Sequence, residues 1–395
     1  MKILFIGGVF AKENENEIIQ NTKTYVEYSA NIFQEKLIKG FKENNCDIDV
    51  LSAPLIGAYP NAYKKIYFNG FKNKQEKYKY VKFLNIWGIR NISRTLSLKK
   101  AVKYFIKLPE KDKLIIVYCP HTPFLEAAVY AKKKDKNIKI CFVVPDLPQY
   151  MNFSEKNRAI YDFFKRIDIK RLNKLTTKVD SFVLLTEYMK YKLNVGDRPY
   201  IVIEGIANEV NEIIQKTQKS TEKYIVYTGK MSKKFGVINL IDAFRLLKNE
   251  NYKLVLCGTG DAVDYINEAR ELDSRIIYKG QVSYNEAKEW ITKADVLVNP
   301  RQNNEEYTKY SFPSKIIDYL QSGKPVVAYL LDGMPEIYKE FLFIPKDESC
   351  EELANAIEYC IENYIESVQK SKAAIIYLNK NLIPKIIANK LLDIN

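Results

Sequence analysis

Three stretches in the second half of the chain follow predicted strands and carry side chains suited to an anionic ligand. The first, 227–236, runs from a strand into an amphipathic helix and holds Gly229, Lys230 and Lys234. A glycine turn lets a ligand approach the backbone, a helix N-terminus offers unpaired N–H groups to phosphate, and lysines add positive charge. The stretch predicts a phosphate-binding turn, with an ordinary lysine-rich surface turn as the alternative.

The other two stretches differ in how specific they are. The second, 257–261, closes a strand with Gly258 and opens a helix, which alone is a weak signal. In the third, 299–327, Pro313 and Gly323 frame a helix of about eight to ten residues, because proline favours the first helical turn and glycine the position past the end. The start of this helix is therefore a second predicted anion site.

Polar side chains accompany that helix start. Ser311 and Ser314 stand at its N-terminus, and Asp318, about one turn later, can accept hydrogen bonds from sugar or ribose hydroxyls. Further candidates in the same stretch are Arg301, Glu305, Glu306, Tyr310 and Lys315.

Alternating strands and helices must position these residues. Predicted strands in the first half are 2–6, 47–51, 114–118, 138–143, 181–185 and 200–203; in the second half they are 224–228, 252–257, 275–279, 296–299 and 325–329. Amphipathic stretches between them include 24–44, 157–177, 237–248 and 351–364. Such alternation with continuously apolar strands implies parallel sheets covered on both faces, and eleven strands exceed an ordinary sheet. We expect an α/β protein of two Rossmann-like, doubly wound domains, which also suits 395 residues.

The domain boundary is expected near 205–222, which is polar and lacks a strand. We assign 1–207 to the first domain and 208–375 to the second. The remainder, 376–395, is predicted to be a terminal helix that packs back on the first domain.

The first domain offers fewer candidates for chemistry. Gly8 follows the first strand, His121 follows the strand at 114–118, and Asp146 follows the next one. Doubly wound sheets bind ligands at such strand ends, although a lone histidine is by default structural and Asp146 could belong to a turn. No G-x-G-x-x-G follows the first strand, which disfavours a nicotinamide-dependent dehydrogenase.

The stretch 224–345 resembles retaining glycosyltransferases of the family-four type, which have the GT-B fold. In that family a G-R/K turn, a G-x-G loop and an E-x7-E helix followed by G-x-P-V-V line the nucleotide-sugar pocket. Here the corresponding residues are Gly229-Lys230, Gly258-Thr259-Gly260 and 318–327, with Asp318 in place of the second glutamate. The resemblance implies that Asp318 holds the donor ribose. It also implies two domains that face each other across a cleft, and no need for a metal.

Two positions depart from the family pattern. Tyr310 stands where the first glutamate would be, so that Glu305 or Glu306 would have to supply the carboxylate. Phe235 stands at the place of the diphosphate lysine, which leaves Lys230, Lys233 or Lys234 to neutralise the phosphates.

The resemblance also supplies expected roles. His121-Thr122-Pro123 matches a His-x-Pro that faces the donor sugar, and we expect His121 and Glu306 to be catalytic. Asp146 is expected on the acceptor side. The expected donor-binding residues are Gly8, Gly229, Lys230, Lys234, Gly258, Arg301, Tyr310, Ser311, Ser314, Lys315 and Asp318.

Positive charge is concentrated in the first half of the chain. The net charge is +14, and residues 1–200 carry 37 basic and 20 acidic side chains against 25 and 28 in the rest. The segment 59–107 alone holds 13 basic residues, one acid (Glu76) and eleven aromatic residues. Basic residues are attracted to anionic headgroups and aromatic residues anchor at the interface, so this segment predicts a membrane-facing surface.

Two other interpretations of 59–107 stay open: a solvated lysine-rich region, and a surface that stacks single-stranded nucleic acid. The second is disfavoured because no nucleic-acid motif accompanies it and the second half of the chain is slightly acidic. We therefore expect no nucleic-acid partner.

The cellular location follows from the cysteines and the start of the chain. The six cysteines are far apart without a C-x-x-C pair, and the apolar start is too short for a signal peptide. No apolar run approaches the ~18–20 residues that span a bilayer. We expect a cytoplasmic protein, peripheral on the inner face of the cell membrane, with no structural metal.

These observations predict an enzyme that transfers a sugar from a nucleoside-diphosphate donor to a glycan or lipid-linked acceptor, with retention, in cell-surface polysaccharide biosynthesis. We expect a UDP-sugar in preference to a GDP-sugar and no cofactor. The enzyme alternatives are an inverting GT-B transferase and a sugar-nucleotide epimerase. The non-enzyme alternative is a basic membrane- or nucleic-acid-binding protein.

Overall fold

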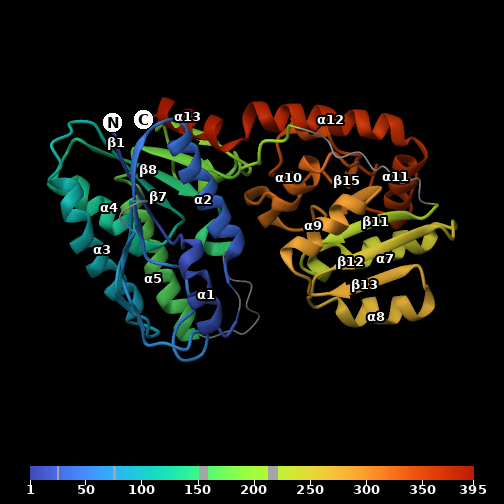
Figure 1. Ribbon diagram of the computed structural model, residues 1–395, viewed down its shortest axis with the longest axis horizontal. Helices are drawn as coiled ribbons and strands as arrows, with labels where there is room; N and C mark the ends of the chain where they lie inside the picture. The colour runs from blue at the N-terminus through green and yellow to red at the C-terminus, as the bar shows by residue number, and fades with distance from the viewer. Residues whose placement is uncertain (25, 74–76, 151–158, 212–220) are drawn as a thin grey trace. The chain divides into compact units, whose positions relative to one another are not determined.

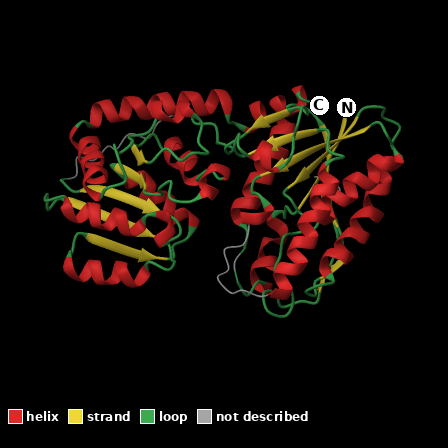
Figure 2. Ribbon diagram, turned by 180° about the vertical axis from the view of Figure 1, so that it is seen from behind, coloured by secondary structure: helices red, strands yellow, loops and turns green. Residues whose placement is uncertain are grey.

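The computed structural model describes residues 1–24, 26–73, 77–150, 159–211 and 221–395 (Figure 1). The chain divides into two compact units. Unit 1 consists of Met1–Ile206 together with Pro384–Asn395, and unit 2 is Ala207–Ile383. Each unit has strands between layers of helices, as Figure 2 shows.

The described strands of unit 1 form an eight-stranded sheet in the order β10-β9-β8-β7-β1-β2-β5-β4. The bounds are β1 Lys2–Gly7, β2 Asp47–Ser52, β4 Lys72–Asn73, β5 Tyr78–Tyr80, β7 Lys113–Tyr118, β8 Ile138–Val144, β9 Ser181–Leu184 and β10 Tyr200–Val202. Every neighbouring pair is parallel except β4 and β5. All residues of β1 and β7 are buried, as expected for strands covered on both faces.

Helices cover both faces of this sheet. Their bounds are α1 Lys12–Asn21, α2 Tyr28–Glu43, α3 Arg90–Ile106, α4 Thr122–Lys134, α5 Ala159–Thr176, α6 Met189–Lys192 and α13 Pro384–Asp393, with a 3-10 turn, η1, at Pro148–Tyr150. Helix α13 packs on α2, whereas α4 packs against both α3 and α5. Right-handed crossovers place α2 and α13 on one face of the sheet and α3, α4 and α5 on the other.

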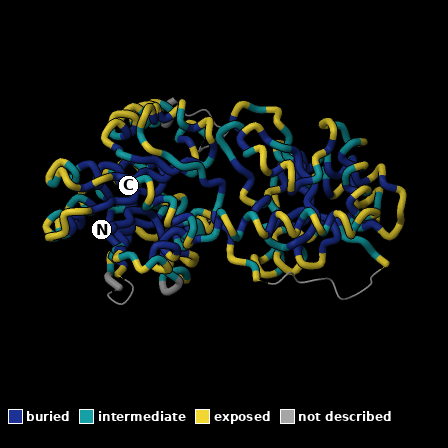
Figure 3. The backbone as a smooth tube through the Cα atoms, turned by 90° about the horizontal axis from the view of Figure 1, so that it is seen from above, coloured by how far each residue is buried: buried dark blue, intermediate teal, exposed yellow. Residues whose placement is uncertain are grey.

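Unit 2 has a five-stranded parallel sheet in the order β13-β12-β11-β14-β15. Its strands are β11 Lys223–Thr228, β12 Tyr252–Cys257, β13 Ile276–Gly280, β14 Val296–Asn299 and β15 Val326–Ala328. Its helices are α7 Val237–Leu246, α8 Val263–Leu272, α9 Tyr284–Lys293, α10 Ser314–Gln321, α11 Cys350–Glu362 and α12 Tyr364–Asn381, and its 3-10 turns are η2 Lys233–Phe235, η3 Glu306–Tyr310 and η4 Glu336–Glu340. The core lies between strands and helices and is buried in Figure 3.

The strand orders locate the ligand-binding edge of each sheet. From β11 the chain adds β12 and β13 on one side and then returns to add β14 and β15 on the other. In unit 1, β1 and β7 occupy the equivalent position. Ligands of doubly wound sheets bind beyond the carboxyl ends of the strands at this switch point. We therefore expect ligands to bind at the loops after β1, β7, β11 and β14.

The end of the chain departs from the sequence prediction. The stretch 376–395 is not one helix, because α12 continues to Asn381 in unit 2 and α13 begins at Pro384. Proline has no N–H to continue a helix but fits the first turn of a new one. The return to unit 1 is present: Asn44, the residue after α2, donates through Nδ2 to the Lys385 carbonyl at 2.8 Å.

The segment 59–107 is more internal than its composition suggested. It contributes β4, β5 and α3 and a separate antiparallel pair, β3 Tyr67–Phe68 with β6 Phe83–Leu84. Six of its eleven aromatic residues are buried: Tyr63, Phe68, Tyr78, Tyr80, Phe83 and Phe105. These six pack inside unit 1 and cannot anchor a membrane interface.

Candidate functional site

Two glycine loops lie side by side at the carboxyl edge of the unit 2 sheet. The Gly229 N–H donates to the Cys257 carbonyl at 2.9 Å. A Cβ added to Gly258 would stand 1.7 Å from the Gly229 carbonyl oxygen, and one added to Gly260 would stand 2.1 Å from that of Met231. Only glycine permits this approach, so both predicted glycine turns belong to one rigid backbone platform.

The lysine turn joins that platform to the loop after β14. Gly236 adopts φ +75°, and a Cβ there would lie 2.0 Å from the Pro300 carbonyl oxygen. The Lys233 N–H donates to the Asp261 carboxylate at 2.9 Å. Lys230 and Lys233 are exposed. The turn thus presents positive charge at the switch point between β11 and β14.

Arg301, directly after β14, is held by three side chains. Its guanidinium lies over the rings of Tyr307 and Phe235, 4.6 and 5.2 Å from their centroids, and Nη2 donates to Ser311 Oγ at 2.7 Å. Its Nε is buried without a hydrogen-bond partner in the described structure. Burial lowers the pKa of Arg301. A guanidinium with an unused donor suits a phosphate or sugar oxygen, which would supply the missing acceptor.

The two adjacent glutamates have different surroundings. Glu305 is half-buried, and its carboxylate pairs with Lys234 Nζ at 2.9 Å. Glu306 is exposed, and its carboxylate lies 3.5 Å from the Tyr310 hydroxyl. Lys234 also lies 5.5 Å from the centroid of the Tyr307 ring. Glu305 is therefore part of the charged cluster around the lysine turn.

Helix α10 is attached to the end of β11 by a tyrosine. Its apolar face, Ile316, Ile317, Tyr319 and Leu320, is buried. The Thr228 N–H donates to Tyr319 Oη at 2.8 Å, and Oη donates to the Thr228 carbonyl at 3.2 Å. Burial raises the pKa of Tyr319 to about 12. Ser314 and Asp318, one turn apart, share the less buried stripe of the helix with Lys315 and remain accessible to a ligand.

In unit 1, His121 caps the start of α4 next to a buried cation. Arg94 Nη1 lies 3.4 Å from His121 Nε2, and Arg94 Nη2 donates to the Pro54 carbonyl at 2.7 Å. The guanidinium stacks on Phe83, 4.3 Å from the ring centroid. Burial and the Arg94 charge lower the pKa of His121 well below its usual value. The imidazole is therefore neutral at pH 7. Burial also lowers the pKa of Arg94 to about 9, which leaves it charged.

The backbone beside His121 is strained. Cys119, the residue after β7, adopts φ +61°, and the His121 N–H donates to the Cys119 carbonyl at 2.7 Å. A left-handed conformation costs about 1–2 kcal/mol for a residue other than glycine. Burial, and then the Asp146 carboxylate, raise the pKa of the Cys119 thiol. Asp146, which is exposed, thus lies at the same sheet edge as His121.

Gly8, which the sequence predicted to contact the donor, is buried. Its N–H donates to Gln34 Oε1 at 2.9 Å, and a Cβ there would lie 2.4 Å from Leu55 Cγ. Gln34 itself is buried on α2. Gly8 therefore shapes the turn after β1 and has its amide already bonded.

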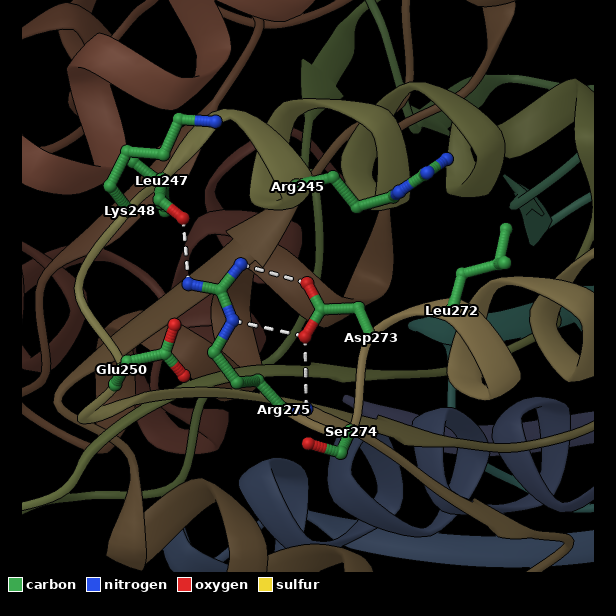
Figure 4. A pocket seen from close by; sticks show the side chains of 8 residues that line it. All are labelled: Arg245, Leu247, Lys248, Glu250, Leu272, Asp273, Ser274 and Arg275. Carbon is green, nitrogen blue, oxygen red and sulfur yellow. Dashed lines mark hydrogen bonds and ion pairs between the residues drawn. The ribbon is translucent and has the colours of Figure 1, made fainter.

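A surface pocket of about 370 Å³ lies at the other edge of the unit 2 sheet (Figure 4). Its lining residues precede β12 and β13. Arg275 donates to both oxygens of Asp273, at 3.0 and 2.7 Å, and to the Leu247 carbonyl at 2.6 Å. The hydrogen bond with Asp273 raises the pKa of Arg275. This guanidinium ties two loops together and is committed to structure.

The described residues contain neither a cluster of metal-binding side chains nor a membrane-spanning helix. No group of three or more His, Cys, Asp or Glu side chains that could hold a metal ion occurs among them. No described helix is long and apolar enough to cross a membrane.

Three positioning residues were missed in the sequence. They are Arg94 beside His121, Tyr319 at the end of β11 and Asp261 at the Lys233 amide. Arg94 was detectable, because it lies on the same stripe of α3 as Leu98, Val102 and Phe105, all of them buried. A basic residue on a buried stripe needs a specific partner.

Part of the chain matches a known protein family. Residues 209–377, which are most of unit 2, match the model of the family described as "Glycosyl transferases group 1". A curated relative, an uncharacterized glycosyltransferase of Methanocaldococcus jannaschii, is 30% identical over 122 residues, which are 30% of each chain. The similarity in sequence is thus confined to less than a third of that relative's length.

Solved structures resemble the whole chain. HepE of Anabaena, in complex with UDP, aligns over 100% of this chain and 99% of its own with a TM-score of 0.64 and 14% identity. Sucrose-phosphate synthase of Thermosynechococcus elongatus aligns over 100% and 98% with a TM-score of 0.66 and 14% identity. TarM aligns over 100% and 98% with a TM-score of 0.64 and 13% identity. At these identities the likeness establishes the fold, and the chain has the two-domain, Rossmann-like GT-B fold that the sequence predicted.

Proposed function

We propose that this protein is a glycosyltransferase that takes a sugar from a nucleoside-diphosphate donor held by unit 2. The observation that carries the proposal is the cluster at the β11–β14 switch point. There a glycine platform, the lysine turn and Arg301 lie within one region that matches the glycosyl transferases group 1 model. The UDP in the HepE complex supports a uridine nucleotide as the donor.

The side chains present suit the chemistry of donor cleavage. As the bond from the anomeric carbon to the diphosphate breaks, negative charge grows on the leaving group. Lys230, Lys233 and Arg301 are placed to stabilise that charge electrostatically. We propose that Asp318 accepts hydrogen bonds from the ribose, and that no metal ion or other cofactor is required because cationic side chains take that part.

The anomeric carbon becomes oxocarbenium-like, and unit 1 supplies candidate groups for the sugar and the acceptor. We propose that His121 binds the donor sugar as a neutral imidazole and that Asp146 lies on the acceptor side. Retention follows from the resemblance to the family-four enzymes. Glu306 stays a proposed carboxylate for this step, with Glu305, which pairs with Lys234, as its alternative.

The proposed acceptor is a glycan or a lipid-linked sugar of a cell-surface polysaccharide, used at the inner face of the cell membrane. The basic first half of the chain supports an anionic membrane surface as a partner. All six cysteines are free, which agrees with a reducing cytoplasm. No nucleic-acid partner is proposed.

A transfer assay with a matched pair of lysine variants tests this function. Lys230 and Lys248 are both exposed in unit 2, but Lys248 follows α7 at the amino edge of the sheet. Release of UDP from UDP-sugars should depend on an acceptor, fall at least about tenfold in Lys230→Ala and stay unchanged in Lys248→Ala. Equal rates in both variants would remove the lysine turn from the donor site. A new sugar nucleotide formed without acceptor would indicate an epimerase, and the anomeric signal of the product by NMR separates retention from inversion.

A further inference from the structure

Unit 1 exposes a group of large apolar side chains on two helices. We call it the α3–α5 surface: Trp87, Ile89, Ile92 and Leu96 on α3 and the turn before it, with Phe163, Phe164 and Ile167 on α5. Each of the seven exposes between 47% and 64% of its area. Single exposed apolar residues are ordinary, but a contiguous group usually marks an interaction site.

Ring contacts join Trp87, Phe163 and Phe164, and two contacts link α3 and the turn before it to α5 or to α4, against which both helices pack. The Trp87 and Phe164 rings lie 6.4 Å apart at 87°. Farther along the helices, the buried Glu126 of α4 accepts a hydrogen bond from Lys99 of α3 at 3.0 Å and pairs with Arg171 of α5. Both helices are therefore linked through one carboxylate of α4, and the three helices are neighbours in Figure 1.

Helical spacing places the apolar residues on the two adjoining faces. Ile92 and Leu96 precede Lys99 by seven and three positions, and Phe164 and Ile167 precede Arg171 by seven and four. Residues at these intervals share a helix face. The apolar residues therefore lie on the helix faces whose cations, Lys99 and Arg171, both pair with Glu126.

The same part of unit 1 holds His121, proposed to bind the donor sugar, and Asp146, proposed for the acceptor side. Helix α3 presents its opposite face inward there, where Arg94 lies between Ile92 and Leu96 in sequence and contacts His121 at 3.4 Å. The N-terminal ends of α3 and α5 both lie at the carboxyl edge of the sheet, since crossover helices run antiparallel to the strands. An acceptor held against the α3–α5 surface would thus be close to His121 and Asp146.

The charge around the surface selects its partner. Helix α3 carries five basic residues and no acid, and α5 carries five basic residues and two acids. Exposed members of this set are Lys100, Lys103, Arg166, Lys170, Arg171 and Lys174. A second copy would bring the same positive charge to the contact and be repelled. An anionic layer that also accepts apolar side chains is a bilayer with acidic headgroups.

We propose that the α3–α5 surface is the face by which unit 1 binds an anionic lipid bilayer. The apolar side chains enter the interfacial region and the surrounding lysines and arginines contact headgroups. This inference deepens the membrane part of the proposed function and names residues of α5 that lie outside 59–107. Within 59–107 most aromatic residues are buried, so the binding face is the helix pair and not the short strands.

Vesicle sedimentation with the full chain tests the proposal. Vesicles of phosphatidylcholine with 30% phosphatidylglycerol (about a third anionic lipid) should bind the protein at low salt, and binding should fall steeply as salt rises. Pure phosphatidylcholine vesicles should bind at least about tenfold less. The double variant Leu96→Ser with Phe163→Ser should lose at least about tenfold in affinity. A matched control, Leu272→Ser with Ile376→Ser, removes two exposed apolar residues of unit 2 and should bind like the parent.

A fluorescence reporter keeps the test independent of those variants. The chain has two tryptophans, so Trp290→Phe leaves Trp87 as the reporter. Its emission should shift to shorter wavelength on addition of the anionic vesicles. An unshifted emission, equal loss in surface and control variants, or a concentration-dependent dimer that the surface variant abolishes would each overturn the proposal. Calorimetry with UDP should be unchanged in the surface variant; loss of vesicle binding with intact UDP binding separates this inference from the donor site.

Discussion

At the scale of single residues, the buried positive charge of Arg94 helps to keep the neighbouring His121 imidazole unprotonated. Arg94 is 2% exposed, and its charge is supported by the Pro54 carbonyl and the Phe83 ring rather than by a carboxylate. Its positive charge and the burial of the imidazole both oppose protonation of His121. A neutral imidazole can donate to or accept from a sugar hydroxyl, which fits the role proposed for it.

The chain has one histidine, so its titration can be observed without resonance assignment. The imidazole carbon-bound proton signals should not shift between pH 8 and pH 6 in the folded protein produced without a histidine tag, because the pKa of His121 lies well below 6.5. Arg94→Met should raise the pKa, whereas Arg94→Lys, which keeps the charge, should raise it less. A midpoint near 6.5 in the parent protein would contradict the Arg94–His121 arrangement.

The same shift predicts how stability depends on pH. Below pH 6.5 the unfolded chain protonates His121 while the folded protein does not, so the unfolded state binds more protons. The free energy of unfolding should therefore decrease as the pH falls through this window. His121→Asn should flatten this part of the profile in urea unfolding at pH 5.5, 6.5 and 7.5. An identical slope in the variant would place the pH dependence elsewhere.

At the scale of elements, the glycines that bring loops together carry the geometry of the donor site. Gly236 and Gly280 both adopt left-handed φ angles, +75° and +67°. A Cβ on Gly236 would meet the Pro300 carbonyl, whereas a Cβ on Gly280 would meet nothing within 4 Å. A substitution at Gly280 therefore adds backbone strain alone. A substitution at Gly236 adds the same strain and a steric clash with the loop after β14.

Gly280→Ala should lower the free energy of unfolding by about 1 kcal/mol through strain alone. Gly236→Ala should cost roughly 1–3 kcal/mol more, because the loop after β14 must move. Denaturation followed by circular dichroism measures both. UDP affinity should fall in Gly236→Ala and be kept in Gly280→Ala; equal losses of stability would mean that the loops after β11 and β14 do not need their close contact.

The sequence was sufficient for the main strands and for the glycine turns, but not for contacts between distant segments. All eleven predicted strands are present within one or two residues at each end, because continuous apolar runs of this length have few alternatives in an α/β chain. The short β3 to β6 were missed, since strands of two or three residues leave no periodic signal. Glu305 pairs with Lys234 across 71 positions, and no local pattern reports such a pair.

At the scale of the whole molecule, the last twelve residues complete a unit that begins at Met1. Helix α13 packs on α2 so closely that a Cβ on Gly40 would lie 2.0 Å from the Pro384 carbonyl oxygen. The chain thus closes unit 1 with its own end. Damage to this contact should act on unit 1 and spare unit 2.

Gly40→Val should lower the melting temperature of unit 1 by several degrees, since overpacking costs about 1–3 kcal/mol. Lys39→Val, at an exposed position on the same helix, is the control for the change of residue type. Differential scanning calorimetry in the presence of UDP should show the transition of unit 2 unchanged. If both variants shift the same transition equally, the α2–α13 contact does not hold the unit together.

Calorimetric titration of the full chain with UDP tests the donor site in unit 2. UDP should bind, Asp318→Asn and Arg301→Lys should each weaken binding at least about tenfold, and Lys248→Ala should leave it unchanged. The absence of UDP and GDP binding, or equal affinities in all four proteins, would contradict the assignment of the β11–β14 switch point as the nucleotide-sugar site.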